Sequence, residues 1–387
     1  MRPVISYVSN KCKKCIRCIK TCPVDAISIV NEQVTIDNKK CINCGKCIQA
    51  CEEKVLKIKK VDIFEALKEH SFNIVLVPSA LLSDIKEYKE LKNIAHALRK
   101  FGFDEVFQYS DIEGFIHEKA LAEYAGKKEV KITSFCPVVN RLIRNEYPTL
   151  LDNILPYDYP VEIAAKELRK KYKDRDIGIF SLCECVGKLT LAQEPFNRRH
   201  SHIDYAISIS SMLPHIKRLK DNHEEDIDLN RSGVKSVVSH LSENESLSMM
   251  SVSGYEQVKQ ALDLIEFDQL DDVDILSLFY CHQGCIGGCY LWGNPFKGRL
   301  LINNLLDECK APIKEIDQEI YTWIREVDEE DQLEFKKKME WFNKVNAILE
   351  TLPHYDCGSC GFANCRTLAS KIVSGEVDDS LCRLKRR

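Results

Sequence analysis

Cysteine dominates the chemistry of this sequence. The chain has 387 residues and 19 cysteines, and twelve of the cysteines fall in two short terminal regions. Several neighbouring cysteines in these regions are separated by only two or three residues. This is the spacing of metal-binding thiolates rather than of a disulfide framework. Disulfides are rare in the cytosol, where thiols are kept reduced. The spacing therefore predicts metal–thiolate sites at both ends of the chain.

The first terminal region contains an internal repeat. The run "CKKCIRCIKTCP" recurs as "CINCGKCIQAC", offset by 29 residues and with Glu52 in place of the proline. In the run C-x2-C-x2-C-x3-C-P, three thiolates hold one four-iron cluster and the fourth ligates the other cluster. Zinc sites, the alternative, pair their cysteines two by two. We expect a bacterial two-cluster ferredoxin domain with [4Fe–4S] clusters on Cys12, Cys15, Cys18 and Cys51, and on Cys22, Cys41, Cys44 and Cys47.

The second terminal region is "YDCGSCGFANCRTLASKIVSGEVDDSLC". Its middle has helical spacing and ends at Gly375. Four cysteines alone do not identify a metal, so a zinc site is the alternative here. The region resembles the small [4Fe–4S] domain of corrinoid iron–sulfur proteins and of the B subunit of Rnf-type electron-transport complexes. The resemblance implies a third accessory cluster on Cys357, Cys360, Cys365 and Cys382.

Between these regions the chain alternates strand-like and helical stretches. Apolar runs such as "FNIVLVPS", "VKITSFCP", "DIGIFSLC", "IDYAISIS" and "VDILSLFYC" predict strands, and a hairpin is predicted around Asn31. The stretches "ALKEH", "YKELKNIAHALRKFG", "VEIAAKELRKKY" and "GYEQVKQALDLIE" predict helices. This alternation indicates an α/β central domain with largely parallel strands. We expect an α+β ferredoxin domain at 1–60, the α/β domain at 61–313, connecting helices at 314–350 and a small helical iron–sulfur domain at 351–387.

Three of these predicted strands run directly into loops that carry cysteine. The loops are "TSFCP" with Cys136, "CECVGK" with Cys185, and "YCHQGCIGG" with Cys281 and Cys285. An isolated cysteine is often only a small buried hydrophobic residue. Four cysteines on strand-end loops, two of them beside a Gly-Gly pair, favour a shared role instead.

At these residues the chain resembles the catalytic domain of [FeFe]-hydrogenases, from about Ser71 to Leu301. "TSFCP" matches the T-S-C-C-P signature, "CECVGK" matches M-P-C-x-x-K, and "CHQGCIGG" matches C-x-G-G-C-x-x-G-G. The resemblance implies an [FeFe]-hydrogenase-like domain whose H-cluster has a cubane half and a two-iron half with CO, cyanide and azadithiolate ligands. It also implies that Cys285 bridges the two halves and that the cubane ligands are Cys136, Cys185, Cys281 and Cys285.

The resemblance extends to side chains that contact the two-iron subsite. Lys188 matches the lysine that hydrogen-bonds a cyanide, although a surface lysine is the plainer reading of that residue alone. Pro78 and Ser79, in "VPSAL", match the residues that contact the other cyanide. A charged donor to an anionic ligand is strongly favoured in a dry pocket.

The sequence departs from productive hydrogenases at Phe135, which stands where they carry a proton-relay cysteine. A phenyl ring neither donates nor accepts a proton, and general acid–base assistance is worth about 10²–10⁴ in rate. Cys183, Cys289 and His282 are candidates for a replacement relay, with plain packing as the alternative. We therefore expect slow turnover, and the departures resemble the hydrogenase branch associated with sensing.

These features predict an oxidoreductase that interconverts H2 with protons and electrons at low activity, with a role in H2 or redox sensing. We expect a redox carrier such as ferredoxin as partner, maturation enzymes that build the two-iron subsite, and a separate signalling protein, because no PAS domain is present. The alternative is a non-catalytic electron carrier or assembly factor that has a cubane but no two-iron subsite. Lys188 and Ser79 argue against that alternative, and Phe135 argues for it.

Composition limits the other possibilities. The net charge is −4, and no long run of Lys and Arg suggests binding to nucleic acid. The longest apolar runs are too short to span a bilayer. The N-terminus lacks the apolar region of a secretion signal. We therefore expect a cytoplasmic protein without membrane insertion.

Overall fold

The computed structural model of the chain describes residues 5–8, 11–30, 33–127, 129–133, 135–196, 200–220, 249–270, 272–306, 315–323 and 335–384. The chain divides into two compact units. Unit 1 comprises Met1–Lys59 and Val327–Arg387, and unit 2 comprises Lys60–Glu326. The polar stretch 222–248 and Cys309 lie outside the described residues. Among the described helices, none combines the length and apolar character needed to cross a membrane.

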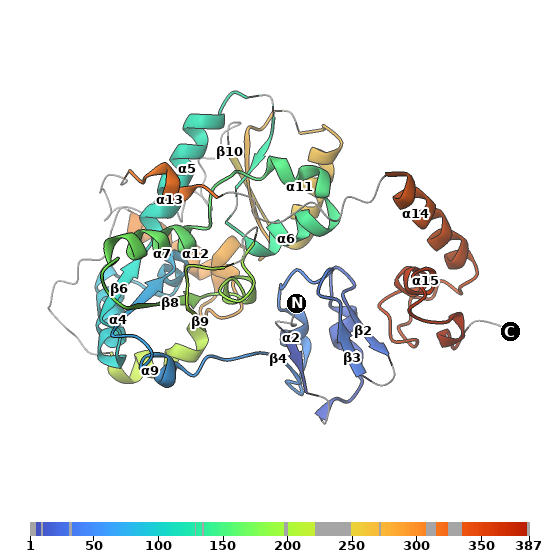
Figure 1. Ribbon diagram of the computed structural model, residues 1–387, viewed down its shortest axis with the longest axis horizontal. Coiled ribbons are helices and arrows are strands. Elements are labelled where there is room, and N and C mark those ends of the chain that lie inside the picture. The colour runs from blue at the N-terminus through green and yellow to red at the C-terminus, as the bar shows by residue number, and fades with distance from the viewer. Residues whose placement is uncertain are drawn as a thin grey trace. The chain divides into compact units, whose positions relative to one another are not determined.

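Unit 2 contains two parallel sheets (Figure 1). The first has the strand order β6-β5-β8-β9, and all its neighbours pair in parallel. The second has the order β10-β11-β7, again all parallel. The predicted α/β domain with parallel strands is thus confirmed. The strands are β5 (Phe72–Val77), β6 (Glu105–Gln108), β7 (Lys131–Ile132), β8 (Ile177–Cys183), β9 (Tyr205–Ser208), β10 (Met249–Ser253) and β11 (Ile275–Phe279).

Central strands of parallel sheets are buried on both faces, so they have continuous apolar sequences. All seven residues of β8 and all five of β11 are buried. The edge strands β6 and β10 have fewer apolar residues, and sequence periodicity did not predict them. Phe180 of β8 illustrates the packing, because its ring centroid lies 4.6 Å from that of Tyr205 and 5.2 Å from that of Phe103.

Helices flank and connect the strands of unit 2. Leu91, Ile94 and Leu98 lie on one buried face of α4, and Gly102 with φ of 130° ends this helix. The predicted helix at "ALKEH" is wrong, because the side chain of Asp62 caps an earlier helix that ends at Ala66. The helices of unit 2 are α3 (Ile63–Ala66), α4 (Tyr88–Phe101), α5 (Ser110–Tyr124), α6 (Pro137–Glu146), α7 (Pro160–Lys171), α8 (Val186–Leu189), α9 (Ile209–Leu219), α11 (Tyr255–Glu266), α12 (Pro295–Leu306) and α13 (Gln318–Tyr321).

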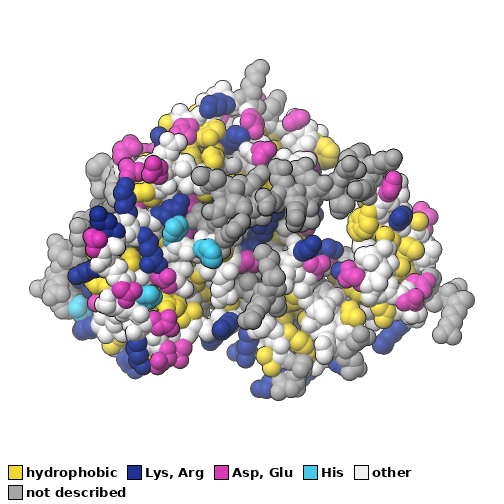
Figure 2. Space-filling view, viewed as in Figure 1, with side chains coloured by type: hydrophobic (Ala, Val, Ile, Leu, Met, Phe, Trp, Pro, Cys, Tyr) yellow, Lys and Arg dark blue, Asp and Glu magenta, His cyan; other side chains and the backbone are white. Residues whose placement is uncertain are grey.

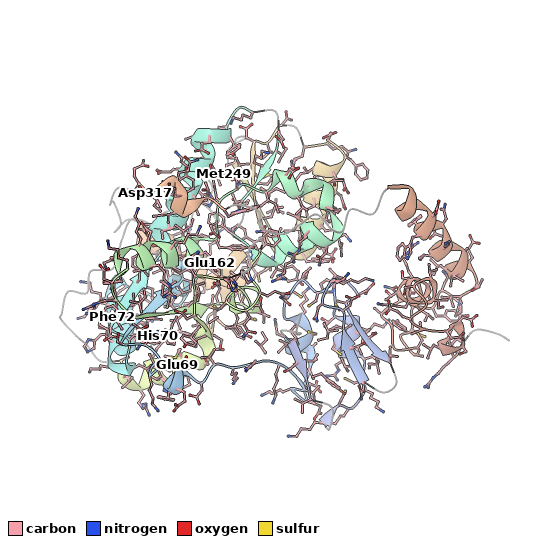
Figure 3. The ribbon with its side chains drawn as sticks, viewed as in Figure 1. Glu69, His70, Phe72, Glu162, Met249 and Asp317 are labelled. Atoms are coloured by element: carbon pink, nitrogen blue, oxygen red, sulfur yellow. The ribbon has the colours of Figure 1, made fainter. Side chains whose placement is uncertain are left out.

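The amino ends of β5 and β8 are joined by polar contacts. His70 Nδ1 lies 2.8 Å from Asp176 Oδ1, and the Ser71 amide donates to the other oxygen of Asp176. The Tyr205 hydroxyl donates to Glu69. Glu69 and His70 lie together near this end of the sheet (Figure 3). These contacts fix the register of the two strands whose opposite ends carry site residues.

The ferredoxin part of unit 1 shows its repeat in the backbone. β1 (Ile5–Tyr7) pairs with β4 (Leu56–Ile58), and β2 (Ile27–Val30) pairs with β3 (Gln33–Ile36), both antiparallel. The second pair is the predicted hairpin. The helices α1 (Arg17–Lys20) and α2 (Lys46–Ala50) occupy equivalent places in the two copies. Left-handed residues recur at the same offset of 29, as the pairs Lys14 and Asn43, Ile16 and Gly45, and Asp25 and Lys54.

The C-terminal part of unit 1 contains α14 (Phe335–Glu350) and α15 (Cys365–Val373), which lie on one side of the β2–β3 hairpin (Figure 1). The Ile29 amide donates to the Gly361 carbonyl over 2.8 Å. The Lys20 ammonium donates to the carbonyl oxygens of Asp356 and Ala363. These bonds tie the cysteine loop of the C-terminal part to the ferredoxin part.

A second set of contacts in unit 1 is centred on Asp25. Its Oδ2 accepts from Asn364 Nδ2 over 2.7 Å and from Thr367 Oγ1 over 3.0 Å. Val30 packs on the small apolar core formed by α14 and α15. The first and last segments of the chain therefore share one interface in this unit.

Replacing Gly361 with alanine should loosen this interface. A Cβ at Gly361 would stand 2.1 Å from the Ile29 carbonyl oxygen, and its φ of 87° disfavours any L-residue. Gly375→Ala is the matched control, because Gly375 has φ of 73° but a Cβ added there would meet no atom within 4 Å. Hydrogen exchange at the Ile29 amide should be about tenfold faster in Gly361→Ala, the loss of roughly one hydrogen bond. Equal exchange in the two variants would contradict the interface.

Candidate functional site

The site residues of unit 2 lie at the carboxyl ends of its strands. Parallel sheets present these ends on one edge, which is where α/β proteins bind their ligands. The backbone reaches the loops directly from β5, β7, β8 and β11, so segments far apart in sequence meet there. The residues that follow these four strands are Pro78, Ser79, Phe135, Cys136, Cys185, Cys281 and Cys285.

Cys285 lies within electrostatic reach of the other three cysteines of these loops. Burial raises the pKa of the Cys185 thiol well above its usual value, and charge on Cys281 and Cys285 raises it further. Burial likewise raises the pKa of Cys285, with added contributions from Cys136 and Cys281. These interactions place Cys285 near Cys136, Cys185 and Cys281, although 149 residues separate Cys136 from Cys285 in the sequence.

A pocket opens beside Cys285. Cys285 is the cysteine that lines it, among the described residues, and Pro78 is not part of the lining. The lining residues are Ser79, Ala80, Glu113, Phe135, Lys188, Phe279, Gln283, Gly284, Cys285 and Ile286.

Two carboxylates at this pocket were missed by the sequence analysis. Glu184 is fully buried, and its Oε1 lies 2.6 Å from Lys188 Nζ. Glu113 accepts a hydrogen bond from the Ser79 hydroxyl. Burial raises the pKa of Glu113 to about 7, although Lys188 and Ser79 act in the opposite direction. Lys188 and Ser79, two of the three residues predicted to contact diatomic ligands, thus have carboxylate partners within the protein.

The sequence gives a clue to one of these two carboxylates and none to the other. Glu184 stands between Cys183 and Cys185, where the hydrogenase signature has proline, so the sequence carried a visible departure. Glu113 lies on α5, more than seventy residues before Cys185, and no spacing links it to the cysteine loops. Only the folded chain brings Glu113 to Ser79.

Phe135 forms part of an apolar wall. Its ring stacks on the His117 imidazole with a centroid distance of 4.8 Å and an interplanar angle of 13°. Burial lowers the pKa of His117 to about 3, so this imidazole is neutral at pH 7. His117 Nδ1 lies 3.4 Å from the Met249 sulfur, at the start of β10 (Figure 3). Glu113 lies one helical turn from His117 on α5.

The three candidates for a replacement relay are not among the lining residues in the described part of the chain. Cys183 is fully buried in β8, and burial raises its pKa to about 12, so its thiol is protonated at pH 7. The His282 ring packs edge-on against Phe296 at 5.7 Å. Cys289 is half-buried. Packing accounts for Cys183 and His282 in this arrangement.

The Gly-Gly pair allows two cysteine loops to pack on each other. A Cβ at Gly287 would stand 2.0 Å from the His282 carbonyl oxygen, and one at Gly288 would stand 2.5 Å from the Glu184 carbonyl oxygen. The Tyr290 amide also donates to that Glu184 oxygen over 2.8 Å. Larger residues at these glycines would push the Cys285 loop away from the Cys185 loop.

The cysteines of the ferredoxin part interact electrostatically with one another. Burial raises the pKa of Cys18 to about 11, and the other charges acting on it come from Cys51, Cys12 and Cys15. Burial also raises the pKa of Cys47, together with charge on Cys44, Cys41, Cys22 and Cys18. The thiols of the repeat are therefore close in space, and their division between two clusters stays a prediction.

The four C-terminal cysteines line a single pocket with about 330 Å³ of empty space. They are Cys357, Cys360, Cys365 and Cys382. Nowhere in the described ranges do three His, Cys, Asp or Glu side chains converge as ligands of one metal ion. A four-iron cluster takes its thiolates on different irons, so its ligands stand further apart.

Comparison with known families assigns all three regions. Residues 80–232 match the family model of the iron-only hydrogenase large subunit, C-terminal domain. Residues 4–52 match a 4Fe-4S dicluster domain, and residues 352–384 match an Fe–S cluster domain. No curated protein matches the sequence.

Solved structures similar to this chain include a single-residue variant of the [FeFe]-hydrogenase HydA1 from Chlamydomonas reinhardtii. It is 16% identical, and the match covers 64% of this chain and 90% of that chain with a TM-score of 0.47. The [FeFe]-hydrogenase HydA(deltaEFG) gives 16% identity, coverage of 64% and 89%, and a TM-score of 0.47. From the three family matches, this chain is a hydrogenase-like iron–sulfur protein, with a match to a 4Fe-4S dicluster domain before the hydrogenase-like region and a match to an Fe–S cluster domain after it.

Proposed function

We propose that the protein is a slow [FeFe]-hydrogenase-like oxidoreductase that interconverts H2 with protons and electrons and serves as an H2 or redox sensor. The observation that carries this proposal is the pocket beside Cys285, whose wall contains the ammonium of Lys188 and the hydroxyl of Ser79. Bound there, a two-iron group supplies the chemistry of the H–H bond. The protein binds, orients and insulates it.

The residues present fit such a cofactor. In this proposal Cys136, Cys185, Cys281 and Cys285 hold the cubane half. Lys188 presents a charged donor to anionic ligands in a pocket where most neighbours are apolar, which is where charge-assisted hydrogen bonds are strong. The Ser79 hydroxyl donates to Glu113 and would serve such a ligand by turning its proton towards it. Three further clusters, on the eight ferredoxin cysteines and the four C-terminal ones, carry electrons to a partner such as ferredoxin.

Slow turnover follows from the wall that Phe135 and His117 form. The phenyl ring has no exchangeable proton, and the neutral His117 ring is covered by it on one face. Proton transfer assistance is worth about 10²–10⁴ in rate, so its loss at this position slows the reaction by that order. Slow turnover suits a sensor, in which occupancy of the site is the output. In this role the protein works in the cytoplasm with maturation enzymes and a separate signalling protein.

The alternative function is electron transfer or cluster assembly with a cubane but no two-iron subsite. The ion pair between Lys188 and Glu184 favours it, because the ammonium already has an anionic partner. The hydrogen bond from Ser79 to Glu113 acts in the same direction. The two functions differ in one measurable ligand set, the CO and cyanide of the two-iron subsite.

Infrared spectroscopy of the protein after anaerobic maturation should show CO and cyanide stretching bands. Cys285→Ser should lose these bands while keeping the accessory clusters, because Cys285 lines the pocket and is the proposed link to the two-iron group. Iron content and electron paramagnetic resonance report the accessory clusters in both proteins. Bands that are absent from the matured wild-type protein would establish the alternative function.

Phe135→Cys should raise H2-dependent dye reduction by up to about 10²–10⁴-fold, since it restores an ionisable group in the pocket wall. Phe279→Cys is the matched control, because Phe279 also lines the pocket. The control places a thiol in the same pocket at a position that the hydrogenase signature does not use for proton transfer. Equal rates in the two variants and the wild type would show that the missing cysteine does not limit turnover.

A further inference from the structure

The buried ion pair between Glu184 and Lys188 has no counterpart in the hydrogenase signature that the loop matches. The Glu184 side chain is 0% exposed and that of Lys188 is 10% exposed. Apart from this ion pair, neither oxygen of Glu184 has a hydrogen-bond partner among the described residues. Glu184 follows directly after β8 and precedes Cys185, so the strand fixes its position.

Such a pair is a poor way to stabilise a fold. Removing two charges from water costs several kcal/mol per ion, and apolar replacements are often neutral or more stable. The residue at this position in the matched signature is an apolar proline. The pair is therefore better explained by what its charges do at the pocket.

The pair lies between the cysteine loops and the pocket. Glu184 directly precedes Cys185, and Lys188 lines the pocket together with Cys285. Lys188 lies in the pocket wall and Glu184 lies behind it, outside the lining. The ammonium has three donors, and Glu184 occupies one direction. The remaining donors can serve a ligand in the pocket, but the net charge of the pair is zero.

We propose that Glu184 is a positioning residue that fixes the Lys188 ammonium at the pocket wall and cancels its charge. This cancellation lowers the affinity of the pocket for anionic ligands and keeps the reduction potential of the adjacent cluster low. An uncancelled cation in a low-dielectric site stabilises whatever negative charge is added there, whether by an electron or by an anionic ligand. The inference rests on the proposed cubane at Cys136, Cys185, Cys281 and Cys285, but not on catalysis.

The test compares four proteins that carry the accessory clusters and the cubane but no two-iron group. They are the wild type, Glu184→Gln, Glu184→Asp and the double variant Glu184→Gln with Lys188→Met. The cubane reduction potential is measured by a titration followed by electron paramagnetic resonance. The affinity for a synthetic two-iron azadithiolate complex with CO and cyanide ligands is measured as the concentration for half-maximal uptake.

Glu184→Gln should favour cubane reduction by about tenfold, equivalent to a positive shift of 59 mV for one electron. It should also take up the anionic complex at a lower concentration than the wild type. Glu184→Asp keeps the charge and should stay close to the wild type in both readouts. The double variant removes both charges, so its potential should return towards that of the wild type.

A purely structural role for Glu184 predicts a different pattern. The variants Glu184→Gln and Glu184→Asp would then shift the cubane reduction potential by the same amount, or neither would shift it. Either result would overturn the proposal. If Glu184→Gln does not fold, the double variant decides, because a potential far from that of the wild type contradicts charge cancellation. The cubane reduction potential is measured without any reaction of H2. An absence of catalysis in the matured protein therefore leaves this inference standing, while an absence of a cubane signal in the wild type overturns both.

Discussion

Parallel strands end on the same edge of a sheet, and this constraint decides what the central unit can do. Four strands from two sheets deliver thiols, a lysine and a serine to one place, although the cysteines are far apart in sequence. The edge is also where helices begin, so backbone amides and short helices surround the thiols. The opposite edge carries the polar contacts that hold the strand register. Because the contacts that hold the strand register lie at the opposite edge, the cysteine edge can form a pocket without disturbing the sheets.

Much of this arrangement could be predicted from sequence, because a buried strand that leads to a cysteine loop appears as an apolar run followed by cysteine. β8 and β11 are continuous apolar runs that end at cysteine loops, and the ferredoxin repeat is explicit in its spacing. The short edge strands β6 and β10 left no such pattern, since their residues are only partly buried or alternate between protein and solvent. Glu113 and His117 were not predictable, because their partners Ser79 and Phe135 come from other strands. Glu184 was predictable in principle, as a charged residue within a cysteine pair.

The pocket combines few charges with several apolar neighbours, so each charge has a large effect. Two carboxylates and one ammonium are buried there, together with thiols whose pKa values are raised by burial. Charged groups on the outer surface are different, because solvent screens them and both signs are interspersed on the visible face (Figure 2). Redox chemistry moves charge into a site one electron at a time. The pairing of ions at the pocket is therefore a more informative feature than the net charge of the chain.

The shared interface of the first and last segments has a consequence for synthesis on the ribosome. The 267 residues of Lys60–Glu326 are made between the two halves of unit 1. At a synthesis rate of about 5–20 residues per second, these residues take roughly 13–53 s to make, and the ferredoxin segment lacks its C-terminal partner during that time. During that interval the Ile29 amide and the Lys20 ammonium lack the carbonyl acceptors that they have in the finished protein. The nascent chain therefore exposes these donors until Gly361 and Ala363 have been synthesised.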